Sequence, residues 1–201
     1  MFPFVTEYFV IGDNTITLQL PEENAVQTWY RQQDQQLSFP FWARIWPAAK
    51  ALTQYLASHP EYYTDKDVVE FGAGIGLPAL FTAPSAKNVL MTDHADDAIH
   101  WFNQYHIQQY NNVQYQHFDW YQQKAWPPAG CVLLSDVNYR DGDFKALLNL
   151  IEHYSKQQAV ILLSTPQRII ARDFVQIIAP YVKTETSIEI DEHTISVYVL
   201  G

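Results

Sequence analysis

The sequence has few basic residues and a single cysteine, and each shortage excludes a class of protein. Twelve lysines and arginines stand against 22 acids, which gives a net charge of −10. Nucleic-acid binding through phosphates depends on clustered Lys and Arg, so this balance argues against that function. The one cysteine, Cys131, excludes an internal disulfide framework and a Cys-rich zinc site. No His-x-Glu or Cys partner accompanies the seven histidines, so we expect no metal.

Long apolar runs are also missing. No stretch approaches the roughly 18 uninterrupted apolar residues of a membrane-spanning helix. The first residues, 1–7, lack the basic start and apolar run of a signal peptide. We therefore expect a cytoplasmic protein that binds small molecules or protein partners, with no membrane and no nucleic acid among its partners.

Apolar and aromatic residues are abundant. Hydrophobic residues make up 48% of the 201 positions, and the aromatic set comprises 6 Trp, 13 Tyr and 11 Phe. This composition is too apolar for a disordered chain, and the length is sufficient for one sizeable core. We expect a single domain over residues 1–201, because the sequence shows no internal repeat or long linker.

The first forty residues differ from the rest and predict a short N-terminal extension. Residues 8–11 and 15–18 predict two strands around a turn at Gly12, and residues 24–36 predict a polar helix. Pro40 closes this extension, so the core is expected over residues 41–201. It begins with an amphipathic helix at 48–58.

Past residue 66, runs typical of strands alternate with stretches of helical periodicity. Helices are expected at about 77–83, around Phe144–Ile151 and around Phe174–Ile178. A further helix is expected whose one face is formed by Ile99, Phe102, His106, Ile107 and Tyr110. Strands are expected at 68–71, 88–93, 113–118, 131–135, 159–163, 182–190 and 193–200. This alternation predicts an α/β three-layer sandwich with a seven-stranded, mostly parallel sheet ending in an antiparallel hairpin.

A glycine-rich turn follows the strand at 68–71. Gly72, Gly74 and Gly76 form Gly-x-Gly-x-Gly, preceded by the acid Glu70. Glycine permits a tight turn and close approach of a ligand, and ligands bind at the carboxyl ends of such strands. The dinucleotide fingerprint requires a glycine where this chain has Leu77, so that interpretation fails.

Acidic residues end the next two strands. Asp93 closes the strand at 88–93 and is followed by His94, while Asp119 and Trp120 follow the strand at 113–118. Taken alone, Asp93 is also compatible with capping the next helix, and Asp119 with a turn. Their register with the glycine turn favours a ligand site, because all three features meet at one edge of the sheet.

The Glu-x-Gly-x-Gly-x-Gly segment resembles motif I of the seven-strand S-adenosylmethionine-dependent methyltransferases, which have a Rossmann-like fold. The resemblance implies S-adenosyl-L-methionine as cofactor, with Asp93 on its ribose hydroxyls, Asp119 near its adenine amine and Trp120 on the adenine ring. The cofactor-binding residues expected on this basis are Trp46, Glu70, Gly72, Gly74, Gly76, Asp93, His94, Asp119, Trp120 and Ser135.

The strand at 131–135 leads into Asp136-x-x-Tyr139, without the prolines of the Asn/Asp-Pro-Pro-Tyr motif. With the aromatic-Trp-Ala…Trp-Pro segment at 41–47, it resembles the protein-lysine methyltransferase branch called methyltransferase family 16, including enzymes acting on the electron-transfer flavoprotein β subunit. The resemblance implies Asp136 and Tyr139 as catalytic residues. Residues 164–168, Ser-Thr-Pro-Gln-Arg, depart from those enzymes, which have an acid and a glycine around the proline.

The chemistry suits a lysine acceptor, because a carboxylate such as Asp136 can orient an amine and aromatic faces attract ammonium groups. We expect Tyr139, Trp42, Trp46 and Trp120 to form such a wall. The net charge also suits a cationic acceptor.

Two other functions remain open: a small-molecule N- or O-methyltransferase on the same fold, and a non-catalytic module that binds the cofactor or a partner. The alternatives for Arg44 are a salt bridge to a cofactor carboxylate and a plain surface position. Three tryptophans receive no role from the sequence: Trp29, Trp101 and Trp126.

Overall fold

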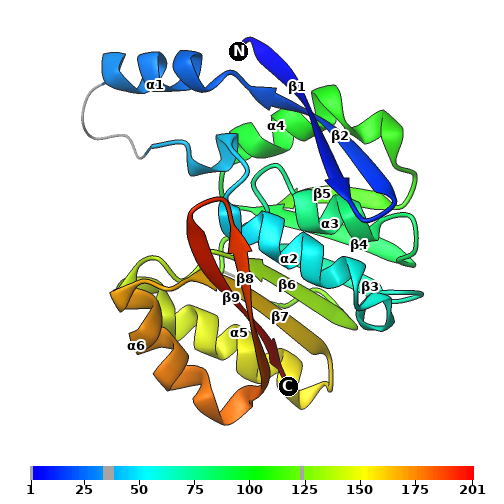
Figure 1. Ribbon diagram of the computed structural model, residues 1–201, viewed down its shortest axis with the longest axis vertical. Coiled ribbons are helices and arrows are strands. Elements are labelled where there is room, and N and C mark those ends of the chain that lie inside the picture. Colours follow the sequence, from blue (N-terminus) through cyan, green and yellow to red (C-terminus); the bar gives the residue numbers. More distant parts are fainter. Residues whose placement is uncertain (1, 34–38, 123–124) are drawn as a thin grey trace.

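The computed structural model describes residues 2–33, 39–122 and 125–201 (Figure 1). Its centre is a seven-stranded sheet in the order β5-β4-β3-β6-β7-β9-β8. The first five strands of this order are parallel, and β9 pairs antiparallel with both neighbours, which confirms the predicted fold class. The strands are β3 Asp67–Phe71, β4 Asn88–Asp93, β5 Val113–His117, β6 Cys131–Ser135, β7 Val160–Pro166, β8 Val182–Ile190 and β9 His193–Leu200.

Helices cover both faces of this sheet. The helices α2 Pro47–Ala57, α3 Leu77–Thr82 and α4 Asp96–Tyr105 contribute side chains to one apolar cluster. The helices α5 Phe144–Lys156 and α6 Ile169–Ile178 lie on the opposite face over a second cluster. The central strand β6 alternates its buried side chains between the two clusters, which explains its almost continuous apolar sequence. Among the described residues, no helix combines the length and apolar character needed to cross a bilayer.

The helix expected to reach Tyr110 ends earlier than the apolar pattern predicts. Residue Tyr105 closes α4, and Ile107–Gln109 forms a separate 3-10 turn. His106 is buried at this junction, with Nε2 3.2 Å from the carbonyl oxygen of Gln19. The chain beyond the helix keeps only part of the pattern, because Tyr110 packs on the core whereas Ile107 is 42% exposed, so the expectation of one helical face was wrong here.

The N-terminal extension forms a two-stranded ribbon and a helix, as predicted. The ribbon pairs β1 Phe4–Ile11 with β2 Asn14–Pro21, and α1 Glu23–Gln32 follows. The last residues expected in this helix, 34–36, lie outside the described residues. Figure 1 shows the ribbon beside α4, and Trp101 Nε1 donates a 2.8 Å hydrogen bond to the Gln19 carbonyl. The ribbon is therefore attached to the core.

The three tryptophans without a role in the sequence are packing residues. Trp126 lies in the connection between β5 and β6, and its ring centroid is 5.8 Å from that of Phe71 and 6.1 Å from that of Tyr154. It covers part of the sheet face that carries α5 and α6. Trp101 lies 6.1 Å from Trp42, and Trp29 lies 5.7 Å from Phe2.

Candidate active site

The candidate site lies where the carboxyl ends of the parallel strands meet. The central strand β3 pairs with β4 on one side and β6 on the other, so the chain switches direction around it. Open α/β sheets bind ligands in the crevice at such a switch point. Gly72, Asp93 and Asp136 each lie at or just beyond the end of one of these three strands.

The glycine turn requires glycine at each of its three positions. Gly72, Gly74 and Gly76 have φ values of +65°, +54° and +81°, in the region that other residues rarely adopt. A Cβ added to Gly76 would lie 2.0 Å from Cε of Met91, and one on Gly74 would lie 3.2 Å from the backbone oxygen of Trp42. The turn is thus tightly packed against Met91 and Trp42.

Asp93 holds this turn in place. Its Oδ2 accepts the Gly74 N–H at 2.9 Å, and its Oδ1 accepts the Ala95 N–H at 3.0 Å. The Tyr115 hydroxyl of β5 also fixes the turn, by donating a hydrogen bond to the Gly74 carbonyl at 2.6 Å. A carboxylate has about four lone-pair positions, so Asp93 retains acceptor capacity for ribose hydroxyls. Its geometry fits the predicted cofactor while also explaining the shape of the loop.

Glu70 is fully buried behind the turn. Its Oε2 accepts the Ala79 N–H of α3 at 3.0 Å. Burial raises the pKa of this carboxyl to about 8, the Ala79 hydrogen bond opposes the shift, and the charge of Asp93 adds to it. Glu70 therefore anchors α3 to β3, and its direct role toward the cofactor stays a prediction.

His94 and Asp119 lie around the Asp93 carboxylate. His94 Nδ1 is 3.3 Å from Asp93 Oδ1, and this contact raises the pKa of the imidazole against the opposing effect of burial. The Asp119 charge raises the same pKa further, which places Asp119 within electrostatic reach. Asp119 Oδ1 accepts the Tyr121 N–H at 2.9 Å, so it forms the turn that the sequence also allowed.

Trp120 lies against α5. It lines a hollow of about 280 Å³ together with Tyr121 and residues on and just before that helix. Among the residues that the structure describes, no ring contact or hydrogen bond joins Trp120 to Asp93 or the glycine turn. The predicted stacking of this ring on adenine therefore stays a prediction.

Asp136 has an unusual backbone and a buried charge. Its φ is +52°, and its N–H donates to the Ser164 carbonyl at 2.9 Å across the β6–β7 boundary. The side chain is only 10% exposed, and Oδ2 accepts a hydrogen bond from Arg168 Nη2 at 2.7 Å. Burial raises the pKa of Asp136, and the Arg168 guanidinium opposes this shift. Strained, desolvated carboxylates of this kind cluster at functional sites.

An aromatic surface lies near Asp136, and two members of the expected set, Trp42 and Trp120, have no ring contact with it among the described residues. Tyr139 lies 5.7 Å from Phe41, and Phe41 lies 5.8 Å from Trp46. Arg44 covers the Trp46 ring at 4.4 Å and pairs with Glu23.

Trp42 does not belong to this surface, so that expectation was wrong. The 3-10 turn Phe41–Ala43 directs neighbouring side chains to different sides. Trp42 is buried against Trp101 as a result, whereas Phe41 is 46% exposed. Phe41 takes the position expected of Trp42 in the aromatic surface.

Tyr139 lies near both the residues expected to bind the cofactor and the residue expected to orient the acceptor. Burial raises the pKa of the Tyr139 phenol most, and the charges of Asp143, Asp93 and Asp136 add to the shift against Arg140. Tyr139 therefore lies within electrostatic reach of both the Asp93 end of β4 and the Asp136 end of β6.

Three side chains near Asp136 have buried polar atoms, and the sequence assigned only one of them, Ser135, to the site. Both amide atoms of Asn138 and the hydroxyls of Ser135 and Ser164 have no hydrogen-bond partner among the described residues. Ser135 and Ser164 are paired across β6 and β7, and Asn138 is 1% exposed. Buried polar groups are nearly always partnered, so these atoms fit a site whose partner arrives with a polar ligand. The polar residue inside Asp136-x-x-Tyr139 was the available signal.

Comparison with known proteins places this geometry in a family. The family model described as lysine methyltransferase matches residues 31–179. Histone-arginine methyltransferase METTL23 of Homo sapiens is 29% identical over 116 residues, which are 53% of this chain and 60% of that protein. Protein N-lysine methyltransferase METTL21A of Danio rerio is 32% identical over 130 residues, 61% of this chain and 59% of that protein.

A further relative is named for the substrate of the enzymes that the sequence resembles, the electron-transfer flavoprotein β subunit. Electron transfer flavoprotein beta subunit lysine methyltransferase of Rattus norvegicus is 36% identical over 66 residues, 32% of this chain and 26% of that protein. The chain thus spans less than two thirds of the length of the curated relatives it matches.

Solved structures show the same fold. The N-methyltransferase NodS from Bradyrhizobium japonicum WM9, in complex with S-adenosyl-l-homocysteine, has a TM-score of 0.61 at 15% identity, covering 89% of this chain and 98% of that one. A TehB-like SAM-dependent methyltransferase from Corynebacterium glutamicum has a TM-score of 0.56 at 16% identity, covering 89% and 96%. Because the family model extends over well over half of its residues, this chain belongs to the lysine methyltransferase family, methyltransferase family 16.

Proposed function

We propose that this protein transfers a methyl group from S-adenosyl-L-methionine to the side-chain nitrogen of a lysine in a protein. The observation that supports this most directly is the position of Asp136 just beyond the end of β6, with Tyr139 packed on Phe41 and within electrostatic reach of both Asp93 and Asp136. The relatives named as protein-lysine methyltransferases support the same acceptor.

The cofactor site of this proposal is the turn after β3 and the end of β4. Gly72, Gly74 and Gly76 would bring backbone close to the ligand, and Asp93 would accept its ribose hydroxyls. Asp119 would lie toward its adenine. When bound, S-adenosyl-L-methionine supplies an electrophilic methyl group, and its transfer requires the acceptor nitrogen to be in line with that group.

The acceptor side of the site is built around Asp136. A lysine reacts only as the neutral amine, and desolvation beside another cation lowers its pKa. The Asp136 carboxylate would accept a hydrogen bond from the amine and fix its direction. Phe41, Trp46 and Tyr139 would face the rest of the side chain, and each aromatic face attracts an ammonium group by about 0.5–2 kcal/mol.

An arginine acceptor is the second candidate, and one contact favours it. Asp136 already binds a guanidinium in this structure, that of Arg168 at 2.7 Å. One relative is also named as a histone-arginine methyltransferase. Mass spectrometry of the labelled residue distinguishes methyl-lysine from methyl-arginine.

The test combines labelling of a host lysate with one matched pair of variants. Wild-type protein with labelled cofactor should label a protein, and Asp136→Asn should abolish this transfer. Calorimetry should show the cofactor affinity of Asp136→Asn within about threefold of wild type, because the substitution removes charge at the acceptor side only. Asp141→Asn, an exposed acid nearby, is the control and should retain activity.

Other outcomes would contradict the proposal in distinct ways. Label confined to the small-molecule fraction would favour a small-molecule methyltransferase. Cofactor binding without any label would favour a non-catalytic module, and unchanged activity in Asp136→Asn would overturn the catalytic assignment. The cytoplasmic location also stays a prediction, which cell fractionation checks.

A further inference from the structure

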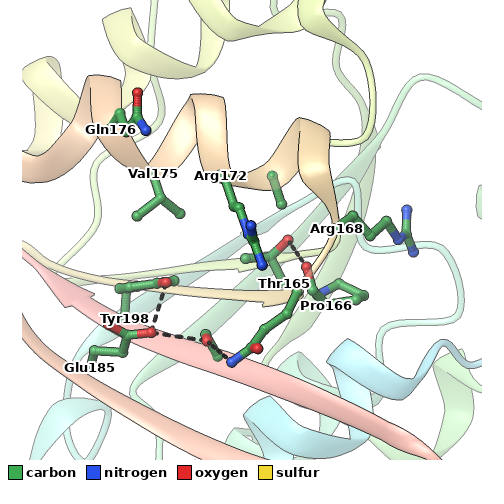
Figure 2. A pocket seen from close by; sticks show the side chains of 11 residues that line it. Thr165, Pro166, Arg168, Arg172, Val175, Gln176, Glu185 and Tyr198 are labelled. Carbon is green, nitrogen blue, oxygen red and sulfur yellow. Dashed lines mark hydrogen bonds between the residues drawn. The ribbon is translucent and has the colours of Figure 1, made fainter.

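A second feature of the acceptor side is a cavity of about 320 Å³ between α6 and the strands β7, β8 and β9 (Figure 2). Its strand side holds a fixed polar network. Glu185 Oε1 accepts hydrogen bonds from the Ser196 hydroxyl at 3.0 Å and the Tyr198 hydroxyl at 2.9 Å. Gln167 Nε2 donates to Ser196 Oγ at 3.3 Å. The floor of the cavity is therefore built and held in one arrangement.

The helix side of the cavity carries a cation, Arg172. Figure 2 shows Arg172 extending from α6 toward the strands, with Val175 on the same side of the cavity. Arg172 forms no side-chain hydrogen bond or ion pair with any residue that the structure describes. The other four arginines of the chain each have a polar side-chain partner: Arg31 with Gln27, Arg44 with Glu23, Arg140 with Asp143 and Arg168 with Asp136.

The cavity adjoins the proposed acceptor position. Arg168 lines the cavity, and its guanidinium is bound to Asp136 Oδ2 at 2.7 Å. Arg168 and Arg172 are one turn apart on the chain that leads into and forms α6, so they lie on the same side of it. A side chain entering the cavity would therefore come from a residue close to the one bound at Asp136.

We propose that this cavity binds an acidic side chain of the acceptor protein on Arg172, while the neighbouring acceptor residue lies at Asp136. This inference rests on the proposed function. A planar guanidinium binds a carboxylate through two parallel hydrogen bonds, which gives both direction and specificity. Glu185, the acid that lines the same cavity, is held on the strand side by the hydroxyl groups of Ser196 and Tyr198, which both donate to its Oε1, and no ion pair joins it to Arg172 among the described residues.

The charge of the whole chain restricts where an acidic segment can bind. With a net charge of −10, most of the surface repels an acidic segment. Arg172, which has no ion pair among the described residues, offers such a segment a local attraction near the proposed acceptor site. The acceptor would be recognised by two opposite charges, a cation at Asp136 and an anion at Arg172, which fixes its orientation.

The test uses the acceptor identified by lysate labelling and measures kcat and KM of purified full-length enzyme. Arg172→Gln should raise KM about fivefold and Arg172→Glu more than about tenfold, with kcat within about twofold of wild type. The reason is that the lost contact has the same strength in the bound substrate and in the transition state, so its loss weakens binding without slowing the transfer. Arg31→Glu, which reverses an exposed arginine on α1, is the control and should leave KM unchanged. Arg172 is exposed, so its variants should melt within a degree or two of wild type.

A charge exchange completes the test. Acids near the acceptor residue are changed to lysine one at a time, and one of these acceptors should be methylated better by Arg172→Glu than by wild type. Equal KM values for Arg172→Glu and Arg31→Glu would overturn the cavity as a subsite while leaving the proposed function intact. Failure of every exchange to restore transfer would also overturn it, and absence of any labelled protein would overturn both proposals together.

Discussion

At the scale of single residues, Asp93 joins two tasks in one carboxylate. It holds the glycine turn through Gly74 and the start of α4 through Ala95, and a carboxylate with these two bonds keeps acceptor capacity for the predicted cofactor. Asp93→Ala should weaken binding of S-adenosyl-L-methionine by more than about tenfold, because ribose donors lose a buried acceptor and the Gly74 N–H loses its partner. Isothermal titration calorimetry measures this change.

Asp96→Ala is the matched control for this substitution. Asp96 lies three residues further along, is exposed and pairs with His117 at 2.9 Å. Its removal should leave cofactor affinity unchanged. An affinity of Asp93→Ala equal to that of Asp96→Ala would show that the end of β4 does not contact the cofactor.

Glu70 predicts a pH dependence of stability. The folded-state pKa of about 8 lies above the ordinary 4.5, so between these pH values the folded chain binds more protons than the unfolded chain. The contribution of Glu70 is therefore full below pH 4.5 and is lost as the pH rises through 8. Glu70→Gln keeps an acceptor for Ala79 and removes the ionisation, so its urea midpoint should fall less over this range. Parallel curves for Glu70→Gln and wild type would contradict the assignment, and exposed Glu23→Gln is the control.

Site residues that directly follow a strand were predictable from the sequence, whereas site residues contributed by other elements were not. Asp93 and Asp136 were predictable because a parallel sheet brings the ends of its strands to one edge. Arg168 and Phe41 were not, because contacts with Asp136 and Tyr139 depend on how α6 and a 3-10 turn approach the sheet. Asn138 stands inside the Asp136-x-x-Tyr139 motif, but its burial without a hydrogen-bond partner among the described residues is visible only in the folded chain.

At the scale of elements, the junction from β3 to α3 is the most constrained connection of the site. Gly76→Ala places a Cβ against Met91, a fully buried residue of β4, and also strains a backbone at φ +81°. Strain and overpacking together should lower the free energy of unfolding by about 2–4 kcal/mol. Urea denaturation measures this loss.

Gly12→Ala isolates the backbone contribution. Gly12 has a φ of +57° and no atom within 4 Å of an added Cβ, so only the conformational cost of about 1 kcal/mol is expected there. A double-mutant cycle of Gly76→Ala with Met91→Ala should show a coupling of about 1 kcal/mol or more, because the shorter side chain makes room. Equal losses in Gly76→Ala and Gly12→Ala would mean that Met91 does not limit this turn.

Helices and strands of the core were predictable where the spacing of apolar residues in the sequence matches the pattern of buried residues in the structure. The antiparallel hairpin β8–β9 was expected from a tight turn at Asp191–Glu192, and the structure places that turn at Asp191, with φ +54°. The end of α4 was not predictable, since His106 keeps the apolar pattern in a non-helical backbone. Periodicity reports burial, and burial continues wherever the chain stays on the core.

At the scale of the whole molecule, the N-terminal ribbon belongs to the same apolar cluster as α2, α3 and α4. Ile11, Ile16, Leu18 and Leu20 are buried in that cluster. The family match begins at residue 31, so the ribbon is an addition to the matched part. Shared burial predicts that the extension and the core unfold together as one cooperative unit.

Leu18→Ala tests this cooperativity. Leu18 is fully buried, so the truncation should cost about 2–4 kcal/mol through lost burial and a residual cavity. Far-ultraviolet circular dichroism and tryptophan fluorescence should give coincident urea transitions with an unchanged m value, because the tryptophans include Trp101, bonded to the ribbon, and Trp126 on the opposite face of the sheet. Val10→Ala removes a side chain that is 73% exposed and should cost less than about 0.5 kcal/mol. Separate transitions for the two probes, or a loss in Leu18→Ala no larger than in Val10→Ala, would instead mean that the ribbon folds apart from the core.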